Sequence, residues 1–172
     1  TLDLSLNQLT EVKLDKIDVE NLPNLISLNM EGNSELTSIN IQDQPKLVDV
    51  KTSSNTGLRQ LTTVIAKNNP ELVNLGYYTM SNVYFSQVAS LTKVELVNLP
   101  KVTKVILDRN SISELNVTDL FIENLPVQGN KLTDNVFDNL QNLPNLKTLD
   151  LSLNQLTEVK LDKIDVGNLP NL

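Results

Sequence analysis

The sequence contains the same 25-residue stretch twice. Residues 1–25 read TLDLSLNQLTEVKLDKIDVENLPNL, and residues 148–172 repeat them with one difference, Glu20 against Gly167. The offset between the copies is 147 residues. Self-similarity at a fixed period is typical of proteins built from units that stack side by side. We therefore interpret residues 1–172 as a single continuous solenoid, in which residues 1–147 form one large repeat unit and residues 148–172 start the next copy.

A shorter apolar pattern runs through the whole chain. Apolar residues alternate with polar ones in short stretches, which is the signature of β-strands. Most steps between these stretches are 10 or 11 residues, and two steps make a turn of about 20–26 residues. The expected strands are marked by Leu2, Val12, Leu28, Ile39, Val50, Leu61, Leu75, Val94, Val105, Leu115, Leu125, Leu149 and Val159.

The composition fits a narrow, layered core and disfavours several functions. Hydrophobic residues make up 40% of the chain but aromatic residues only 3%, so the core must consist of Leu, Val and Ile. The net charge of −7 disfavours binding to nucleic acid or to anionic membranes, since both need clustered cations. No apolar run is long enough to cross a bilayer.

A recurring motif adds a family resemblance. Leu146, Leu149, Leu151, Asn154 and Leu156 fit the pattern L-x-x-L-x-L-x-x-N-x-L. The chain thus resembles leucine-rich repeat proteins, and phrases such as SELTSINIQDQPKLVDV resemble bacterial surface members related to internalins. The resemblance implies a strand-dominated α/β solenoid with a parallel concave β-sheet. It implies a convex side of short strands, loops and one or two short helices. Neither end carries a cap of the kind common in this family, so we expect the natural chain to continue at both ends.

Six asparagines follow strands at the family's Asn position, and the expected strands that precede them are assigned to the concave sheet. The strands marked by Val12, Ile39, Leu61, Leu115 and Val159 mostly lack this Asn and are assigned to the convex side. In leucine-rich repeats this amide is buried and bonds to the backbone of its own and adjacent turns, so the resemblance implies a structural ladder. The ladder would satisfy loop N–H and C=O groups that otherwise lack partners. Its expected members are Asn7, Asn33, Asn55, Asn110, Asn130 and Asn154.

The pattern becomes irregular between residues 75 and 105. Met80 stands where an Asn belongs, and Ser81–Leu91 reads as a short capped helix. This region fits either one long turn of about 30 residues or a turn of about 19 residues plus a half-turn. A second helix is predicted at Asp134–Gln141, with Val136, Phe137 and Leu140 facing inward.

The sequence gives little reason to expect catalysis, a cofactor or a metal. The chain has no His and no Cys, which excludes Ser-His and Cys-His nucleophile pairs and thiolate metal sites. Its 5 glycines form no phosphate-binding loop. Asp15 and Asp18 match no calcium loop, and Lys13 and Lys16 lie between and beside them. We predict that the protein is not an enzyme.

A concave patch is the candidate binding site. Most outward positions of the concave strands are polar, but one column of successive turns carries small or apolar residues, with an aromatic residue and cations nearby. Such a strip could bind a protein, and its aromatic residue could stack on a sugar ring. Scattered surface apolarity is the simpler interpretation. The patch consists of Tyr78, Gly76, Lys104, Ile106, Arg109 and Pro126.

These observations favour a non-catalytic binding or structural module of a repetitive bacterial cell-surface or extracellular protein. Its partner would be a protein or glycan on another surface, in adhesion or protein–protein interaction, or neighbouring copies of itself end to end. One alternative is a stalk or filament protein without a specific ligand. Another is a carbohydrate-acting enzyme on a parallel β-solenoid, working with carboxylates, Lys and Arg alone.

Overall fold

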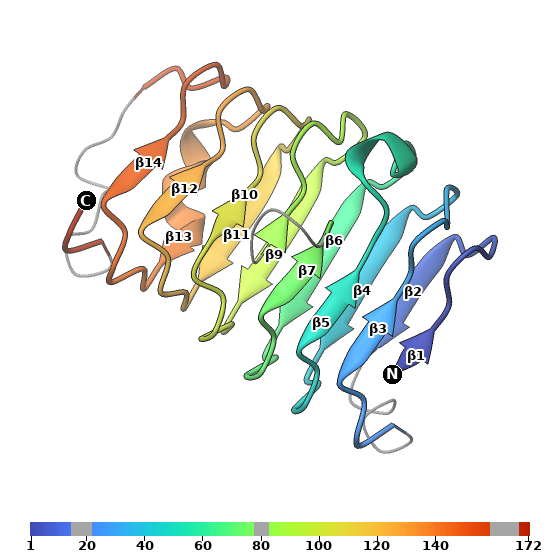
Figure 1. Ribbon diagram of the computed structural model, residues 1–172. Coiled ribbons are helices and arrows are strands. Elements are labelled where there is room, and N and C mark those ends of the chain that lie inside the picture. Colours follow the sequence, from blue (N-terminus) through green and yellow to red (C-terminus); the bar gives the residue numbers. More distant parts are fainter. Residues whose placement is uncertain (15–21, 78–82, 159–168) are drawn as a thin grey trace.

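The chain folds as a stack of turns, and the strands of successive turns pair to form two parallel β-sheets that face each other across the core (Figure 1). The computed structural model describes residues 1–14, 22–77, 83–158 and 169–172. In Figure 1 the chain progresses along the stack from one end to the other, so the N- and C-terminal ends lie far apart. The fold is therefore a strand-dominated solenoid like that of leucine-rich repeat proteins.

Sheet A lies in front in Figure 1 and consists of short strands. Its six paired strands are β1 (Leu2–Asp3), β3 (Ser27–Asn29), β5 (Asp49–Lys51), β7 (Asn74–Gly76), β8 (Val83–Tyr84) and β10 (Val105–Ile106). On the same side follows a separate pair, β12 (Asn124–Pro126) and β14 (Thr148–Asp150). We use sheet A for this whole side of the solenoid.

Sheet B lies behind it and carries the longer strands. Its members are β2 (Glu11–Leu14), β4 (Ser38–Gln42), β6 (Thr63–Lys67), β9 (Lys93–Val97), β11 (Glu114–Thr118) and β13 (Leu140–Gln141). Four of these strands have 5 residues, and they pair in one continuous sheet, so this side consists of short strands, as predicted, with η2 beside β11. The predicted division of the strands between the two sides is otherwise confirmed where the structure describes them, and Val159 lies outside the described residues. Leu61 is an exception, because it lies in the turn before β6, whose inward residues are Val64 and Ala66.

The core lies between the two sheets and is made of aliphatic side chains. Along β4, Ile39 and Ile41 are fully buried, whereas the residues beside them are half-buried on the outer face. Each fully buried Leu or Ile contributes about 1.5–3 kcal/mol. One turn alone would leave the flanks of these side chains in water, so the solenoid depends on neighbouring turns.

The irregular region contains one additional strand of sheet A. In sheet B, β6 pairs directly with β9, so that Val64 lies opposite Val94 and the turn is 30 residues long. In sheet A, β7 and β8 pair with each other, with Leu75 opposite Val83. The sequence left this register open, and the structure shows one long turn that contributes two strands to sheet A.

The helix predicted over Ser81–Leu91 is wrong for the residues that the structure describes. Val83 and Phe85 are buried and Tyr84 lies between them on the outer face, which is a strand pattern. Gly76 makes the pairing with β7 possible. Its φ is +119°, and a Cβ there would come within 2.4 Å of the Tyr84 carbonyl oxygen. Only glycine allows the two backbones to approach so closely.

Two 3₁₀-helices complete the described structure. η2 (Asp134–Asn139) occupies most of the predicted second helix, and Val136 and Phe137 on it are buried as predicted. It ends at Asn139, because the next residue, Leu140, already belongs to β13. η1 (Asn55–Gly57) forms a corner that was not predicted. Neither helix has the length or hydrophobicity of a membrane span, and the described residues contain no other candidate.

A proline explains why sheet A is interrupted between β10 and β12. Pro126 is the last residue of β12 and faces outward, and proline has no N–H to donate to a β-ladder. Its carbonyl still accepts a hydrogen bond from Leu107 N–H at 3.2 Å. The two strands are therefore neighbours with an incomplete ladder, and the candidate binding groove lies over this position.

Candidate functional site

Four of the six predicted ladder asparagines connect adjacent turns. Asn130 Nδ2 donates to the carbonyls of Leu107 and Val127, both at 2.9 Å, and its Oδ1 accepts from Ile112 N–H at 3.0 Å. The side chains of Asn33, Asn110 and Asn154 make corresponding bonds to their own turn and to the preceding turn. Each of these amides thus joins at least three backbone groups at the corner that follows sheet A.

Asn7 and Asn55 behave differently. Asn7 is exposed and donates to the carbonyls of Leu4 and Ser5 in its own turn. Asn55 begins η1, is half-buried, and accepts from the adjacent Thr56 N–H. Within the described residues neither side chain connects two turns. At Asn55 the 3₁₀-helix replaces the corner that the ladder geometry requires, so its placement in the ladder is corrected.

A second Asx column, at the corner that follows sheet B, was missed by sequence reasoning. Its members adopt left-handed backbone with φ between 50° and 58°, and all are exposed except the half-buried Asp119: Asp43, Asn68, Asn98, Asp119 and Asn142. Several of them bond to one another, as in the 2.9 Å bond from Asn68 Nδ2 to Asp43 Oδ1. Next to this column, Asn69 is fully buried and joins Gln44 N–H to the Ile41 carbonyl. A detectable signal was the repeated Asx-x-Pro at positions 43, 68, 98 and 142.

Three of the six predicted patch residues come together in one groove. Lys104, Ile106 and Pro126 line a hollow of about 510 Å³ on the outer face of sheet A. We call this hollow the sheet A groove. Its lining also includes Thr103, Val105, Phe121, Glu123, Asn124 and Asn145.

The other three predicted residues do not belong to the groove. Gly76 is buried against β8 because of its close approach to Tyr84. Arg109 is 69% exposed and lies beyond the end of β10, with Nε 3.8 Å from Asp108 Oδ2. Tyr78 lies outside the residues that the structure describes.

Tyr84 is the aromatic residue that the sequence interpretation overlooked. It pairs with Ile106 in the parallel register of β8 and β10, so both are outward residues of one column. The column then continues to Pro126 and Asp150 on β12 and β14. Tyr84, Ile106 and Pro126 are all half-buried. The apolar column therefore begins one strand later than predicted, with Tyr84 in place of Gly76.

The groove combines an apolar floor with a polar rim. Ile106 and Pro126 are the apolar outward residues of neighbouring strands, and the Phe121 ring beside them is 48% exposed. On the rim, Glu123 Oε1 lies 3.0 Å from Lys147 Nζ, and Asn145 Nδ2 donates to the Phe121 carbonyl at 3.4 Å. The Oε1 atom of Gln128, two residues after Pro126, is buried without a hydrogen-bond donor among the described residues.

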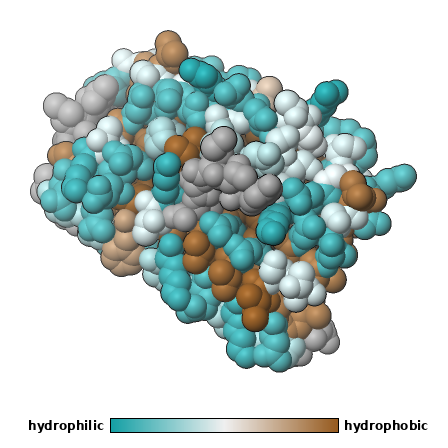
Figure 2. Space-filling model, in the orientation of Figure 1, coloured by the Kyte–Doolittle hydropathy of each residue, from teal (hydrophilic) through white to brown (hydrophobic). Residues whose placement is uncertain are grey.

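Apolar surface also extends along the turns that lead into sheet A. Ile26 is 54% exposed, and Val48 and Val73 hold the equivalent half-buried positions before β5 and β7. Val48 N–H donates to the Ile26 carbonyl, and Val73 N–H to the Val48 carbonyl, so the three residues form a row. Figure 2 shows this face of the molecule, with hydrophobic residues in a band across its lower part and hydrophilic residues around them.

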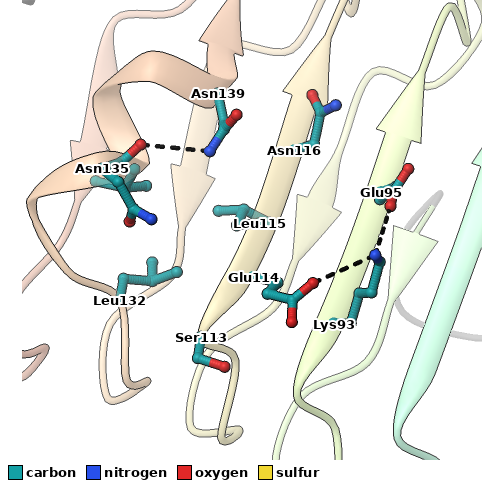
Figure 3. Close-up of a pocket in the computed structure, with 10 residues that line it drawn as sticks. Lys93, Glu95, Ser113, Glu114, Leu115, Asn116, Leu132, Asn135 and Asn139 are labelled. Carbon is teal, nitrogen blue, oxygen red and sulfur yellow. Dashed lines mark hydrogen bonds and ion pairs between the residues drawn. The ribbon is translucent and has the colours of Figure 1, made fainter.

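The outer face of sheet B has a smaller hollow of a different kind. It measures about 230 Å³ and lies between β9, β11 and η2 (Figure 3). Asn135 and Asn139 approach it from η2, whereas Lys93 and Glu95 come from β9. Lys93 Nζ lies 3.0 Å from Glu95 and 3.2 Å from Glu114, and Lys67 also contacts Glu95. These charges are paired with one another across the strands.

The paired charges shift two pKa values. Partial burial raises the pKa of Glu95, but hydrogen bonds from Lys67 and Lys93 outweigh this, and the pKa is lowered overall. The pKa of Lys93 is raised, first by its hydrogen bond to Glu95 and then by Glu114. Both shifts favour the charged forms, so this hollow is a self-satisfied ionic network rather than a set of groups prepared for acid–base chemistry.

Neither hollow contains the elements of a metal centre. The described residues include no cluster of three or more Asp, Glu, His or Cys side chains that could hold an ion. Asp15 and Asp18, which the sequence brought into consideration, lie outside the described residues.

Comparison with known proteins adds one similar structure. No family model matches the sequence, and no curated protein matches it. Among solved structures, the chain is similar to an internalin (inlF) from Listeria monocytogenes, with 17% sequence identity. The similarity covers 88% of this chain and 68% of the internalin chain, with a TM-score of 0.29. The solenoid assignment rests on the strand order and registers of this chain itself.

Proposed function

We propose that this chain is a non-catalytic protein-binding module and that the sheet A groove is its binding site. One observation carries the proposal. On an outer face whose strand residues are mostly polar, Ile106 and Pro126 lie on neighbouring strands beside the half-exposed ring of Phe121, and together they border a hollow of about 510 Å³. Binding sites are typically concave and apolar with a few polar groups that fix orientation.

The lining predicts the chemistry of the partner. An aliphatic or aromatic side chain would fill the groove against Ile106, Pro126 and Phe121, because aromatic residues contribute most to such contacts. The partner backbone would lie near Asn124 and Asn145, whose side-chain amides offer both donors and acceptors. Lys104 and Glu123 on the rim would influence the rate of association more than the final affinity.

Two further parts of the proposal concern context. Repetition of the large unit would give several copies of the groove on one chain, and avidity would then exceed the affinity of a single groove. We place such a protein at a bacterial cell surface or outside the cell, where adhesion is the role that repeated weak sites serve.

A carbohydrate-acting enzyme is the less favoured alternative. Its best catalytic candidates are Asp108 and Arg109, which lie beyond the end of β10 rather than in the groove. Arg109 is largely exposed and directed at its neighbour Asp108 with a long separation. The alternative predicts release of reducing ends from a glycan panel, and loss of that activity in Asp108→Asn.

The test uses two probes on the intact chain: a phage-displayed random peptide library and a glycan array. Peptides selected on the wild-type chain are then measured against Ile106→Asp, which places a charge on the floor of the groove. The matched control is Ile65→Asp, because Ile65 is a half-buried outward isoleucine of sheet B. We expect Ile106→Asp to raise Kd at least about tenfold, or about 1.4 kcal/mol. We expect Ile65→Asp to leave Kd unchanged.

Other outcomes would contradict the proposal in distinguishable ways. Equal binding to wild type and Ile106→Asp would move the binding site away from the groove. Binding to glycans alone would replace the protein partner by a sugar stacked on Phe121. Absence of saturable binding to both probes would favour the stalk without a ligand.

A further inference from the structure

The repeated 25-residue stretch occurs in two different environments in this structure. The N-terminal copy packs against the turn that follows it, with Leu2 of β1 opposite Leu28 of β3. The C-terminal copy packs against the turn that precedes it, with Leu149 of β14 opposite Leu125 of β12. One sequence is thus seen once with a following neighbour and once with a preceding neighbour.

The two environments use different backbone groups. In the N-terminal copy, Leu4 and Leu6 donate their N–H groups to the next turn at 2.8 and 2.7 Å. In the C-terminal copy, the carbonyls of Asp150 and Ser152 accept from the preceding turn at 3.1 and 2.9 Å. Asp150 and Ser152 correspond to Asp3 and Ser5. The two sets do not overlap, so one copy could pair on both sides at the same time.

An asparagine side chain shows the same division. In the N-terminal copy, Asn24 Oδ1 accepts from Lys46 Nζ of the next turn at 2.6 Å. In the C-terminal copy, the equivalent Asn171 donates through Nδ2 to the Pro144 carbonyl of the preceding turn. The oxygen serves one neighbour and the nitrogen the other. A single asparagine therefore has a partner for each end of its amide when both turns are present.

Different leucine positions of the stretch are buried in the two copies. Leu22 is 39% exposed, whereas the equivalent Leu169 is 4% exposed against the preceding turn. Leu25 is 8% exposed beneath the following turn, whereas the equivalent Leu172 is 44% exposed. Each position is buried only in the copy that has the corresponding neighbour.

The end face of the N-terminal copy is correspondingly hollow. Thr1, Leu2 and the residues Leu22–Leu25 border a space of about 320 Å³. In the C-terminal copy, the equivalent segments lie against the turn that contains β12 and Pro144, through the β12–β14 pairing and the Asn171 bond. The C-terminal copy thus shows that a preceding turn can cover the surface that borders the hollow in the N-terminal copy.

We propose that the end face formed by residues 1–14 and 22–25 is a docking surface whose partner is the last turn of another 147-residue unit. Successive units share the repeated stretch as one turn and stack as an uninterrupted solenoid. The Leu107 carbonyl provides an internal precedent for the shared turn, since it accepts from both Asn110 and Asn130. The Leu151 carbonyl, which already accepts from Asn154, can likewise accept from the ladder asparagine of a following turn.

The test is a two-unit chain in which residues 1–172 are followed directly by residues 26–172. Leu172→Asp is introduced at the junction of this chain and, separately, into the single chain. Stacking predicts that the substitution hardly moves the urea midpoint of the single chain, where Leu172 is 44% exposed. In the two-unit chain it should lower the midpoint, or split the transition into two. Leu25→Asp in the single chain is the matched control, because it shows the effect of the same change at a covered position.

Small-angle scattering gives a second, independent measurement. A continuous solenoid predicts a two-unit particle with one rigid rod-like profile, whose maximum dimension grows by the length of one unit. Equal small effects of Leu172→Asp in both chains, or a profile of two units free to move, would overturn the proposal. If Leu172→Asp prevents folding of the two-unit chain alone, Leu172→Ala should give the same difference at smaller size. An Ala effect that is equal in both chains would contradict stacking.

Discussion

The two sides of the solenoid are held together by different means. Sheet B has strands of up to 5 residues, continuous registers, and an outer face on which Lys67, Lys93, Glu95 and Glu114 pair with one another. Sheet A has strands of 2 or 3 residues, and three buried asparagines, Asn33, Asn110 and Asn130, bridge turns at the corners that follow them. At the corners that follow sheet B, the described residues include one such asparagine, Asn69. Because sheet A is stabilised at its corners, its strands can include apolar outward residues, a proline and one additional strand while the turns remain stacked.

The difference also explains why the groove lies on sheet A. Residues on the face of sheet B use their polar groups on one another, so a ligand there would have to break ion pairs before it could bind. On sheet A, Ile106 and Pro126 face outward and make no such network. The proposed binding site thus lies on the side that is held at its corners, and the four predictions below measure how the two sides differ.

The largest effect is expected from the ladder on the sheet A side. Asn130→Leu would remove one donor for two carbonyls and one acceptor for Ile112 N–H at a buried corner. Each backbone group left unpaired costs about 1–3 kcal/mol. We expect urea titrations to show a clear loss of unfolding free energy for Asn130→Leu. Asn33→Leu should show a loss of similar size. Asn55→Leu is the control and should cost much less, because Asn55 does not bridge two turns. Equal effects at Asn55 and Asn130 would contradict the corner account.

Gly76→Ala should be the next largest change. The new Cβ would lie 2.4 Å from the Tyr84 carbonyl oxygen, a backbone atom that cannot move without shifting β8. Backbone strain at this φ adds about 1–3 kcal/mol. Gly129→Ala is the control, since φ is +68° there but the nearest atoms lie 3.5 Å from the new Cβ. Both variants carry backbone strain, but only Gly76→Ala brings its Cβ into steric overlap, so the difference between their Tm values measures the overlap. An equal drop in Tm would mean that the close approach of β7 and β8 does not exclude a Cβ at residue 76.

Glu95→Gln should have a smaller, pH-dependent effect on the sheet B side. Because the pKa of Glu95 is lowered in the folded chain, its contribution is present above the ordinary value of 4.5 and is lost as the pH falls through the folded pKa. We expect the unfolding free energy of wild type to exceed that of the variant by about 0–1 kcal/mol at pH 7. The difference should shrink in urea titrations carried to acidic pH. A difference that stays constant down to pH 3 would show that charge is not its origin.

The smallest effect on stability is expected in the groove itself. Phe121→Ser removes a ring that is 48% exposed, and surface substitutions usually change stability by less than about 0.5 kcal/mol. Chemical denaturation should therefore hardly distinguish the variant from wild type, while peptides selected on wild type bind it more weakly. A large loss of stability would mean that Phe121 belongs to the core rather than to a binding face.

Sequence patterns predicted the solenoid but not all of its parts. The alternation of apolar and polar residues around Ile39 or Val94 indicates a strand with one face buried between two sheets, and every strand in this position needs such a pattern. At residues 83–85 the same alternation was present, but Val83, Val88 and Leu91 could also be assigned to one side of a helix. The strand is favoured because β7 offers a partner, and that partner depends on the close approach at Gly76.

The candidate site was predictable in part for a similar reason. Ile106 and Pro126 follow from counting outward positions within single turns, and both line the groove. Phe121 was missed because it lies in a turn, where alternation gives no direction to a side chain. Tyr84 was missed because the additional strand shifts the column by one position, and register between turns is a property of the stack rather than of any local pattern.

The extra strand also has a consequence for curvature. Between β5 and β10, sheet A contains β7 and β8, whereas sheet B contains only β9 between β6 and β11. At about 4.8 Å per strand, one side is longer than the other by one spacing over the same part of the stack. We expect this wedge to bend the solenoid axis toward sheet B at this position, which is opposite to the concave sheet A that the family resemblance implied. Tyr84 and Ile106 would then lie on the outside of the bend, where side chains of successive strands diverge and leave space between them.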